Sequence, residues 1–144
     1  MKMADEEVRE WWMSAVEELK IAEDMLNLGW YSIACFHAQQ AAEKGLKALL
    51  IACGRLERTH ALPDLLEEAA RHGLDVRGIE ASDIRVLSDQ YMAPRYPNFR
   101  RRLRMQGIIY EYTRTFGEYC IQVAREVLRR VRAWLVEHGH LSRE

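Results

Sequence analysis

The chain has 144 residues, enough for one domain with a substantial hydrophobic core. Hydrophobic residues make up 49% of the chain and charged residues 30%, proportions that exclude a disordered or low-complexity protein. The net charge of −1 argues against a general binder of polyanions, although five arginines and no acidic residue lie between Gln90 and Tyr110. That local excess of positive charge could attract anions.

Three cysteines, Cys35, Cys53 and Cys120, each fall in a helical pattern, and we expect them to be reduced packing residues. No stretch reaches the roughly 18 apolar residues that a membrane helix needs. The acidic, amphipathic beginning of the chain is unlike a secretion signal. We therefore expect a cytoplasmic protein without membrane association, folded as a single domain over residues 1–144.

Two long helices are predicted first, over about residues 4–28 and 31–53. In the first, apolar residues recur at spacings of three and four, which is typical of one amphipathic stripe. The second carries small residues on a wide face, which would let another backbone come close. Gly29 and Gly54 end the two helices, and the short link between them predicts an antiparallel hairpin.

Two short helices are predicted next, over about residues 63–72 and 82–90. Pro63 suits the first turn of one, and Ser82 or Asp83 can cap the other. Pro94 and Pro97 prevent the helix from continuing, and residues 98–110 form a basic connection of undefined structure.

The last helix is predicted over about residues 115–137, where Thr115 and Glu118 have the spacing of a capping box. Its apolar stripe is wider than one contact face needs, so part of it is expected to meet another subunit. No segment has a strand pattern. The predicted fold class is all-α, a bundle of about five helices of which three are long and two short.

A polar stripe crosses the second helix and consists of His37, Gln40, Glu43, Lys44 and Lys47. One interpretation is a solvated face strengthened by a pair between Glu43 and Lys47. The other is a partly covered site in which Gln40 and the lysines point at a ligand or a loop. Phe36 on the same face favours the second interpretation, because an aromatic ring is unusual on a fully solvated face.

Arg95 is the second candidate. Its neighbours in sequence are two tyrosines and two prolines, Tyr91, Tyr96, Pro94 and Pro97. The guanidinium could hold a phosphate or carboxylate through two parallel hydrogen bonds, while a tyrosine stacks on a base. Alternatively, Arg95 pairs with Asp89 or Glu43 and fixes the loop. The arginines at 100–104 could track an RNA backbone or form a solvated loop.

These residues resemble the HEPN domain family, the nucleotide-binding domain shared by higher eukaryotes and prokaryotes. Three segments carry the resemblance: residues 38–49 (AQQAAEKGLKAL), Thr59-His60 followed by Leu62 and Leu65, and Tyr91 with Arg95-Tyr96-Pro97. The resemblance implies an up-and-down bundle that forms homodimers. It also implies a minimal nucleotidyltransferase as protein partner, often in a toxin–antitoxin or related two-component system.

Some members of the family are metal-independent RNases, in which an Arg and a His are separated by four to six residues near the start of the last long helix. Here the positions at that distance after Arg95 are residues 100–102, all arginines, and no His lies between His72 and His138. Arginine does not act as a base, so the sequence favours binding over cleavage.

The leading hypothesis is a homodimeric module that binds a nucleotide or RNA and works with a nucleotidyltransferase partner. The predicted phosphate contacts are Gln40, Lys44, Lys47, His60 and Arg95, with Tyr91 or Tyr96 at the base and His37, Glu43 and Asp89 as polar support. No cofactor, metal site or catalytic residue is predicted. The alternatives are an RNase toxin in which His60 or His37 supplies the acid–base group, and a purely structural domain that binds a protein partner.

Overall fold

The computed structural model describes residues 3–143, and its regular structure in that range is entirely helical. Six helices follow in order: α1 (Met3–Asn27), α2 (Tyr31–Ala52), α3 (Leu62–Arg71), α4 (Ala81–Asp89), α5 (Pro97–Met105) and α6 (Arg114–Glu137). The predicted all-α bundle is confirmed, and it contains one more short helix than expected.

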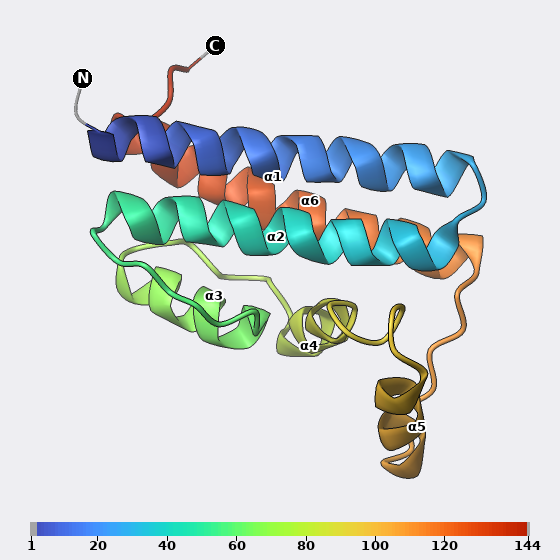
Figure 1. The fold of residues 1–144 in the computed structure, drawn as a ribbon. Helices are drawn as coiled ribbons and strands as arrows, with labels where there is room; N and C mark the ends of the chain where they lie inside the picture. Colours follow the sequence, from blue (N-terminus) through green and yellow to red (C-terminus); the bar gives the residue numbers. More distant parts are fainter. Residues whose placement is uncertain (1–2, 144) are drawn as a thin grey trace.

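The three long helices, α1, α2 and α6, lie side by side and form the body of the molecule (Figure 1). α1 and α2 make the predicted antiparallel hairpin. The buried face of α2 is rich in alanine, so its neighbours come close. At Gly45 an added Cβ would lie 2.3 Å from Cδ2 of Leu128 in α6, so the absence of a side chain there makes room for the leucine.

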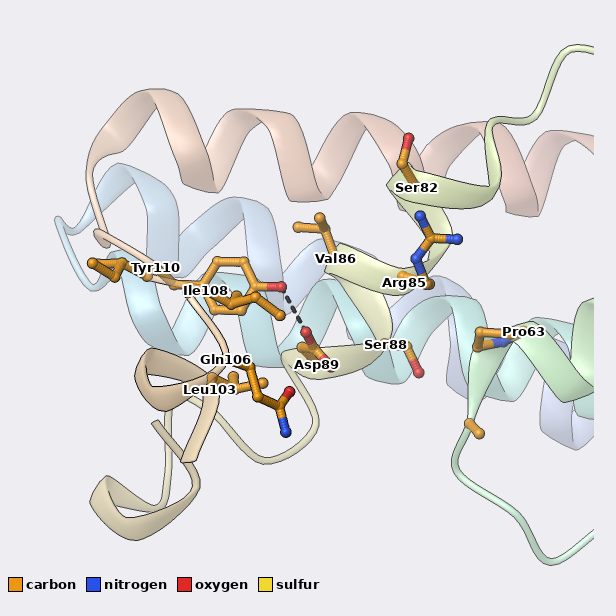
Figure 2. A pocket seen from close by; sticks show the side chains of 13 residues that line it. Pro63, Ser82, Arg85, Val86, Ser88, Asp89, Leu103, Gln106, Ile108 and Tyr110 are labelled. Atoms are coloured by element: carbon orange, nitrogen blue, oxygen red, sulfur yellow. Dashed lines mark hydrogen bonds between the residues drawn. The ribbon is translucent and has the colours of Figure 1, made fainter. Parts of the chain in front are cut away.

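The basic segment after Pro97, for which no defined structure was expected, contains α5. Pro97 occupies the first turn of this helix, after Tyr96 in an extended conformation. Gly107, at a φ of 84°, lies just beyond its end. α5 projects from the bundle (Figure 1), and a cleft of about 640 Å³ lies between α4 and the chain that follows α5 (Figure 2).

The predicted cap of the last helix is wrong by two residues. Thr113, with a φ of −101° and a ψ of 168°, is the capping residue, and its Oγ1 accepts a hydrogen bond from the backbone N–H of Phe116 at 3.2 Å. Thr115 already lies inside the helix. The chain has a threonine at both positions, and the earlier one is the cap because Thr113 has the extended backbone that a capping residue needs.

Cys35 and Cys120 are buried in the core and Cys53 is half-buried, and none of them forms a disulfide. Over residues 3–143, no helix combines the length and the apolar character needed to cross a membrane.

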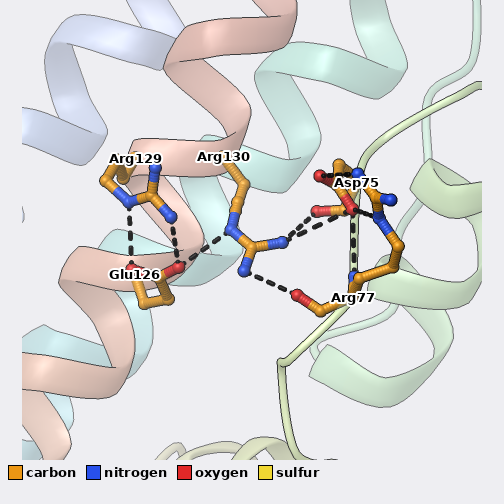
Figure 3. Close-up of polar contacts among 5 residues, drawn as sticks. All are labelled: Asp75, Arg77, Glu126, Arg129 and Arg130. Carbon is orange, nitrogen blue, oxygen red and sulfur yellow. Dashed lines mark hydrogen bonds and ion pairs between the residues drawn. The ribbon is translucent and has the colours of Figure 1, made fainter.

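The connection between α3 and α4 is fastened to α6 by Arg130 (Figure 3). Its Nη1 and Nη2 donate to the carbonyl oxygens of Asp75 and Arg77 at 2.7 and 2.6 Å. Its Nε donates to Oε1 of Glu126 at 2.8 Å. Only 14% of the Arg130 side chain is exposed, so these bonds are largely shielded from water.

Replacing Arg130 with alanine is expected to lower the free energy of unfolding by about 2 kcal/mol, because two main-chain carbonyls lose a charged donor. Arg129→Ala is the matched control, since Arg129 is 67% exposed and pairs with Glu126 alone among the described residues. It should change the free energy of unfolding by less than about 0.5 kcal/mol. Urea unfolding followed by circular dichroism measures both, and equal losses would contradict the role given to Arg130.

Candidate functional site

Three polar residues in the middle of α2 are buried. Gln39, Glu43 and Lys47 are 0%, 4% and 6% exposed. The ring of Trp11 lies 6.0 Å from the Lys47 ammonium, and His60 lies against Glu43. The pair between Glu43 and Lys47 exists, but the solvated-face interpretation is wrong for both residues, because neighbouring side chains cover them.

Glu43 is the centre of this buried network. Its Oε1 accepts a hydrogen bond from Nε2 of Gln39 at 3.0 Å, and its Oε2 accepts one from Nζ of Lys47 at 2.9 Å. Nδ1 of His60 lies 3.0 Å from the same Oε2. Burial alone would raise the pKa of Glu43, but the hydrogen bonds from Lys47, Gln39 and His60 outweigh it and lower the pKa below its usual value of 4.5. Glu43 is therefore an anion at neutral pH.

His60 is oriented by this anion. An ionised carboxylate only accepts hydrogen bonds, so Nδ1 of His60 carries the hydrogen and donates it to Glu43. In the neutral ring, Nε2 is then left as an acceptor, and no described residue bonds to it. The imidazole stacks on the ring of Tyr91 with centroids 4.2 Å apart, and 48% of the side chain is exposed. The result is a fixed imidazole with an available basic nitrogen.

Arg95 lies among three aromatic rings. Its guanidinium carbon is 4.6 Å from the ring centre of Phe36, 4.7 Å from that of Tyr91 and 5.1 Å from that of Tyr96. Nε and Nη2 donate to the main-chain oxygen of Tyr91 at 2.8 and 2.6 Å. Nη1 has no partner within residues 3–143. The cation is thus held in place while part of its hydrogen-bonding capacity stays free.

The alternative in which Arg95 pairs with Asp89 or Glu43 is wrong, because it bonds neither carboxylate. Asp89 lies apart from the cluster. Its Oδ2 accepts a hydrogen bond from the Tyr110 hydroxyl at 2.6 Å in the cleft beside α4 (Figure 2). Burial raises the pKa of Asp89 and that hydrogen bond opposes the rise. The carboxylate of Asp89 therefore belongs to the cleft, and only its main-chain oxygen bonds the loop before Arg95, through the N–H groups of Met92 and Ala93.

A second carboxylate–imidazole pair lies between α1 and α2. Oε1 of Glu18 is 2.9 Å from Nδ1 of His37, and Nζ of Lys44 is 3.3 Å from Oε2 of Glu18 and 2.9 Å from the Ser14 hydroxyl. Burial tends to raise the pKa of Glu18, but His37 and Lys44 together lower it. Lys44 therefore points at α1. The sequence had predicted that it would share a phosphate contact with His60 and Arg95, but it does not reach toward them.

Phe36 joins the two clusters. Its ring is nearly perpendicular to that of His37, with centroids 5.2 Å apart, and it also lies under Arg95. Gln40 donates from Nε2 to Oε1 of Gln39 at 2.7 Å, which links it to the buried Glu43 network. The structure thus brings most of the predicted set together, but Gln40 and Lys47 are engaged with other side chains inside it.

Sequence reasoning missed Glu18 and Gln39 and gave Phe36 no role in the site. Glu18 had a usable signal, because it follows Ala15 by three residues and precedes Ala22 by four, on the buried side of α1. Gln39 adjoins the predicted Gln40 but lies on the buried face of α2. Only the fold shows that Phe36 reaches Arg95.

The other arginines are arranged differently. Arg100 donates from Nη1 to the main-chain oxygen of Ala93 at 2.6 Å and so fixes the turn before α5. Arg125 pairs with Glu23, and Arg129 pairs with Glu126, and both arginines are exposed on the surface of α6.

Comparison with known proteins identifies relatives along most of the chain. The family model of the HEPN domain matches residues 8–134. The sequence is 29% identical over 135 residues to "Putative toxin MJ1304" of Methanocaldococcus jannaschii, covering 85% of this chain and 84% of that protein.

Two solved structures are similar in fold and sequence. TT1696 from Thermus thermophilus superposes with a TM-score of 0.74 at 32% identity, covering 88% of this chain and 96% of its own. ST0689, described as an archaeal HEPN homologue, superposes with a TM-score of 0.66 at 28% identity, covering 94% and 99%.

Proposed function

The chain belongs to the HEPN domain family, and on this premise we propose that it binds a nucleotide or RNA at a phosphate site centred on Arg95. One observation carries the proposal: the Arg95 guanidinium is held over aromatic rings, and one of its nitrogens has no partner among residues 3–143. Arginine on an aromatic support is well suited to a phosphate, because its planar donors remain aligned without further loss of side-chain freedom.

The neighbouring side chains have different proposed roles in binding. His60 would contact the phosphate beside Arg95; in support, it is about half exposed and both residues lie against the ring of Tyr91. The ring of Tyr91 is already stacked on His60, whereas Tyr96 is 42% exposed and is the ring available to a base. Lys44 and Lys47 are paired with buried carboxylates, so they serve the site by keeping Glu18 and Glu43 ionised.

Calorimetric titration with ATP, GTP and short RNA tests this site. Binding by the wild-type protein, and clearly weaker binding by Arg95→Ala, is the expected result. Unchanged binding in the variant would remove Arg95 from the site.

We further propose that the protein is a toxin-type member of the family, acting as a homodimer with a minimal nucleotidyltransferase as partner in the cytoplasm. The relative named as a toxin, alike over 85% of this chain, supports the toxin role. The partner and the dimer are what the family resemblance implies. A gene for a small nucleotidyltransferase beside this one would support the partner, and co-purification of the two products would test it.

A second candidate function is metal-independent RNA cleavage, and the Glu43–His60 pair favours it. The free Nε2 of His60 would take the proton of a ribose 2′-hydroxyl, whose oxygen then attacks the adjacent phosphorus. The bond from phosphorus to the 5′-oxygen breaks, leaving a 2′,3′-cyclic phosphate. The departing oxygen takes up a proton, for which His37, held on Glu18, is the candidate donor.

If this function is present, RNA incubated with the protein in EDTA should be cut to fragments with cyclic phosphate ends. His60→Ala should lower the rate by about 100-fold or more, because general acid–base catalysis contributes roughly that much. His72→Ala is the control, since His72 lies at the end of α3 near Glu68 and away from the cluster. Cleavage that survives in His60→Ala would reject the assignment.

A further inference from the structure

α5 and the turn after it form an arm, residues 97–109, that the rest of the fold leaves largely uncovered (Figure 1). Leu103 is the one residue of α5 that is buried. Met105 and Ile109 are 83% and 67% exposed. A helix of about nine residues has little stability of its own in water. Large apolar side chains exposed together typically mark an interaction surface.

The arginines of this arm are not neutralised within the described chain. Elsewhere many arginines meet carboxylates, namely Arg55, Arg71, Arg77, Arg125, Arg129 and Arg130. On the arm, Arg100 bonds a main-chain oxygen and Arg102 lies over the ring of Phe99. Residues 101 and 104, both arginines, have no partner among residues 3–143. The arm therefore offers unpaired positive charge beside apolar side chains.

The cleft beside the arm supplies an apolar recess (Figure 2). Its volume of about 640 Å³ lies within the range of ligand sites. Val86 of α4 lines one wall, and Leu103 and Ile108 line the other. Arg85 stands at its edge, exposed and without a carboxylate partner in the described part of the chain. The recess has room for apolar side chains, and its edge is positively charged.

We propose that the arm and this cleft are the docking surface for a protein partner that presents acidic residues around an apolar anchor. The anchor enters the cleft between Val86 and Ile108, and the acidic residues meet Arg101 and Arg104. This inference rests on the proposed function in one respect, namely that the protein has a protein partner. The surface shares no residue with the Arg95 site.

Charge and apolar exposure together favour this occupant over two others. RNA would neutralise the arginines but would leave Met105 and Ile109 without an apolar contact. A second copy docked arm to arm would bring two groups of arginines together, and like charges at an interface are repulsive. An acidic partner with an apolar anchor satisfies both features of the arm.

Fluorescence anisotropy of the full chain tests the surface with three labelled probes. The first probe is a synthetic helical peptide with two leucines four positions apart, on one face, among glutamates. The second peptide has the same composition, but its two leucines lie on opposite faces of the helix. The third probe is oligouridine. The variants are Ile109→Asn and the double variant Arg101→Glu, Arg104→Glu. Their matched controls are Met13→Asn and Arg58→Glu, exposed positions outside the arm.

The expected result is that the first peptide binds best and that both arm variants weaken it by about tenfold or more, while the controls do not. ATP binding should persist in the arm variants, and peptide binding should persist in Arg95→Ala, so this proposal and the phosphate site fail independently. Equal binding of both peptides would overturn it. The proposal would also be overturned if oligouridine binds, the peptides do not, and the arm variants lose the oligouridine binding. A dimer that the arm variants dissociate would overturn it as well.

Discussion

Replacing Arg95 with alanine is expected to weaken binding of ATP, GTP and short RNA by about 10- to 100-fold. The loss is large because hydrogen bonds between a guanidinium and a phosphate are charge-assisted on both sides, and each is worth roughly 1.5–3 kcal/mol. Here the cation is already held by the main-chain oxygen of Tyr91 and by the ring of Phe36. Little side-chain freedom is then lost on binding. Isothermal titration calorimetry at fixed low salt measures the change.

Two further variants separate the geometry of Arg95 from its charge. Arg95→Lys keeps a positive charge but loses the planar fork and the stacking on the rings, so it should recover only part of the affinity. Arg58→Ala removes an exposed arginine that has no partner in the described residues, and it should bind as wild type does. A similar loss in Arg58→Ala would mean that net charge, and not the Arg95 site, attracts the ligand.

The long helices were predictable because their sequence patterns are local. Apolar residues at spacings of three and four define α1 and α6, and Gly29 and Gly54 lie at the ends of α1 and α2. α5 was not predictable in this way. Four of its nine residues are arginine, and Leu103 alone is buried, so the segment has almost no apolar pattern. Its helix depends on Pro97 at the start and on the bond from Arg100 to Ala93.

The sequence predicted which residues belong to the candidate site better than it predicted which of them bond to one another. Glu43, His60 and Arg95 are close together because α2, the residues before α3 and the loop after α4 converge, and their residue types alone indicated a polar site. Which acid meets which base depends on side-chain direction across helices. The pairing of Lys44 with Glu18 of α1 shows this, since the two are far apart in sequence and neither has a local signal for the other.

Removing the Glu43 carboxylate is expected to lower the free energy of unfolding by about 3–5 kcal/mol in Glu43→Ala. The reason is Lys47, whose ammonium is 2.9 Å from that carboxylate and whose side chain is 8% exposed. Without Glu43 this cation is buried and uncompensated, and Gln39 loses its acceptor as well. Urea unfolding at neutral pH measures the loss. His60→Ala is the control, because His60 is about half exposed and should cost much less.

The same network gives a pH dependence with a defined sign. The pKa of Glu43 is lower in the folded protein than its usual 4.5. As the pH falls, Glu43 therefore takes up a proton at a higher pH in the unfolded chain than in the folded one. The stabilising contribution is therefore complete above the usual pKa. It is lost as the pH falls through the lower value of the folded state. Wild type should lose stability in that acidic range, and Glu43→Gln should lose less of it.

A double variant shows whether the buried pair of Glu43 and Lys47 is itself stabilising or only costly to break. Lys47→Met alone leaves the anion of Glu43 with Gln39 and His60, and it should be destabilising. The double variant Glu43→Leu, Lys47→Met removes both charges and fills the space with apolar atoms, so it should be much less destabilised than Glu43→Ala. The double variant also removes the carboxylate that orients His60. If its stability is nevertheless restored, Glu43 is needed for the site and not for the fold. A double variant as unstable as Glu43→Ala would instead make the charged pair part of the packing of α2.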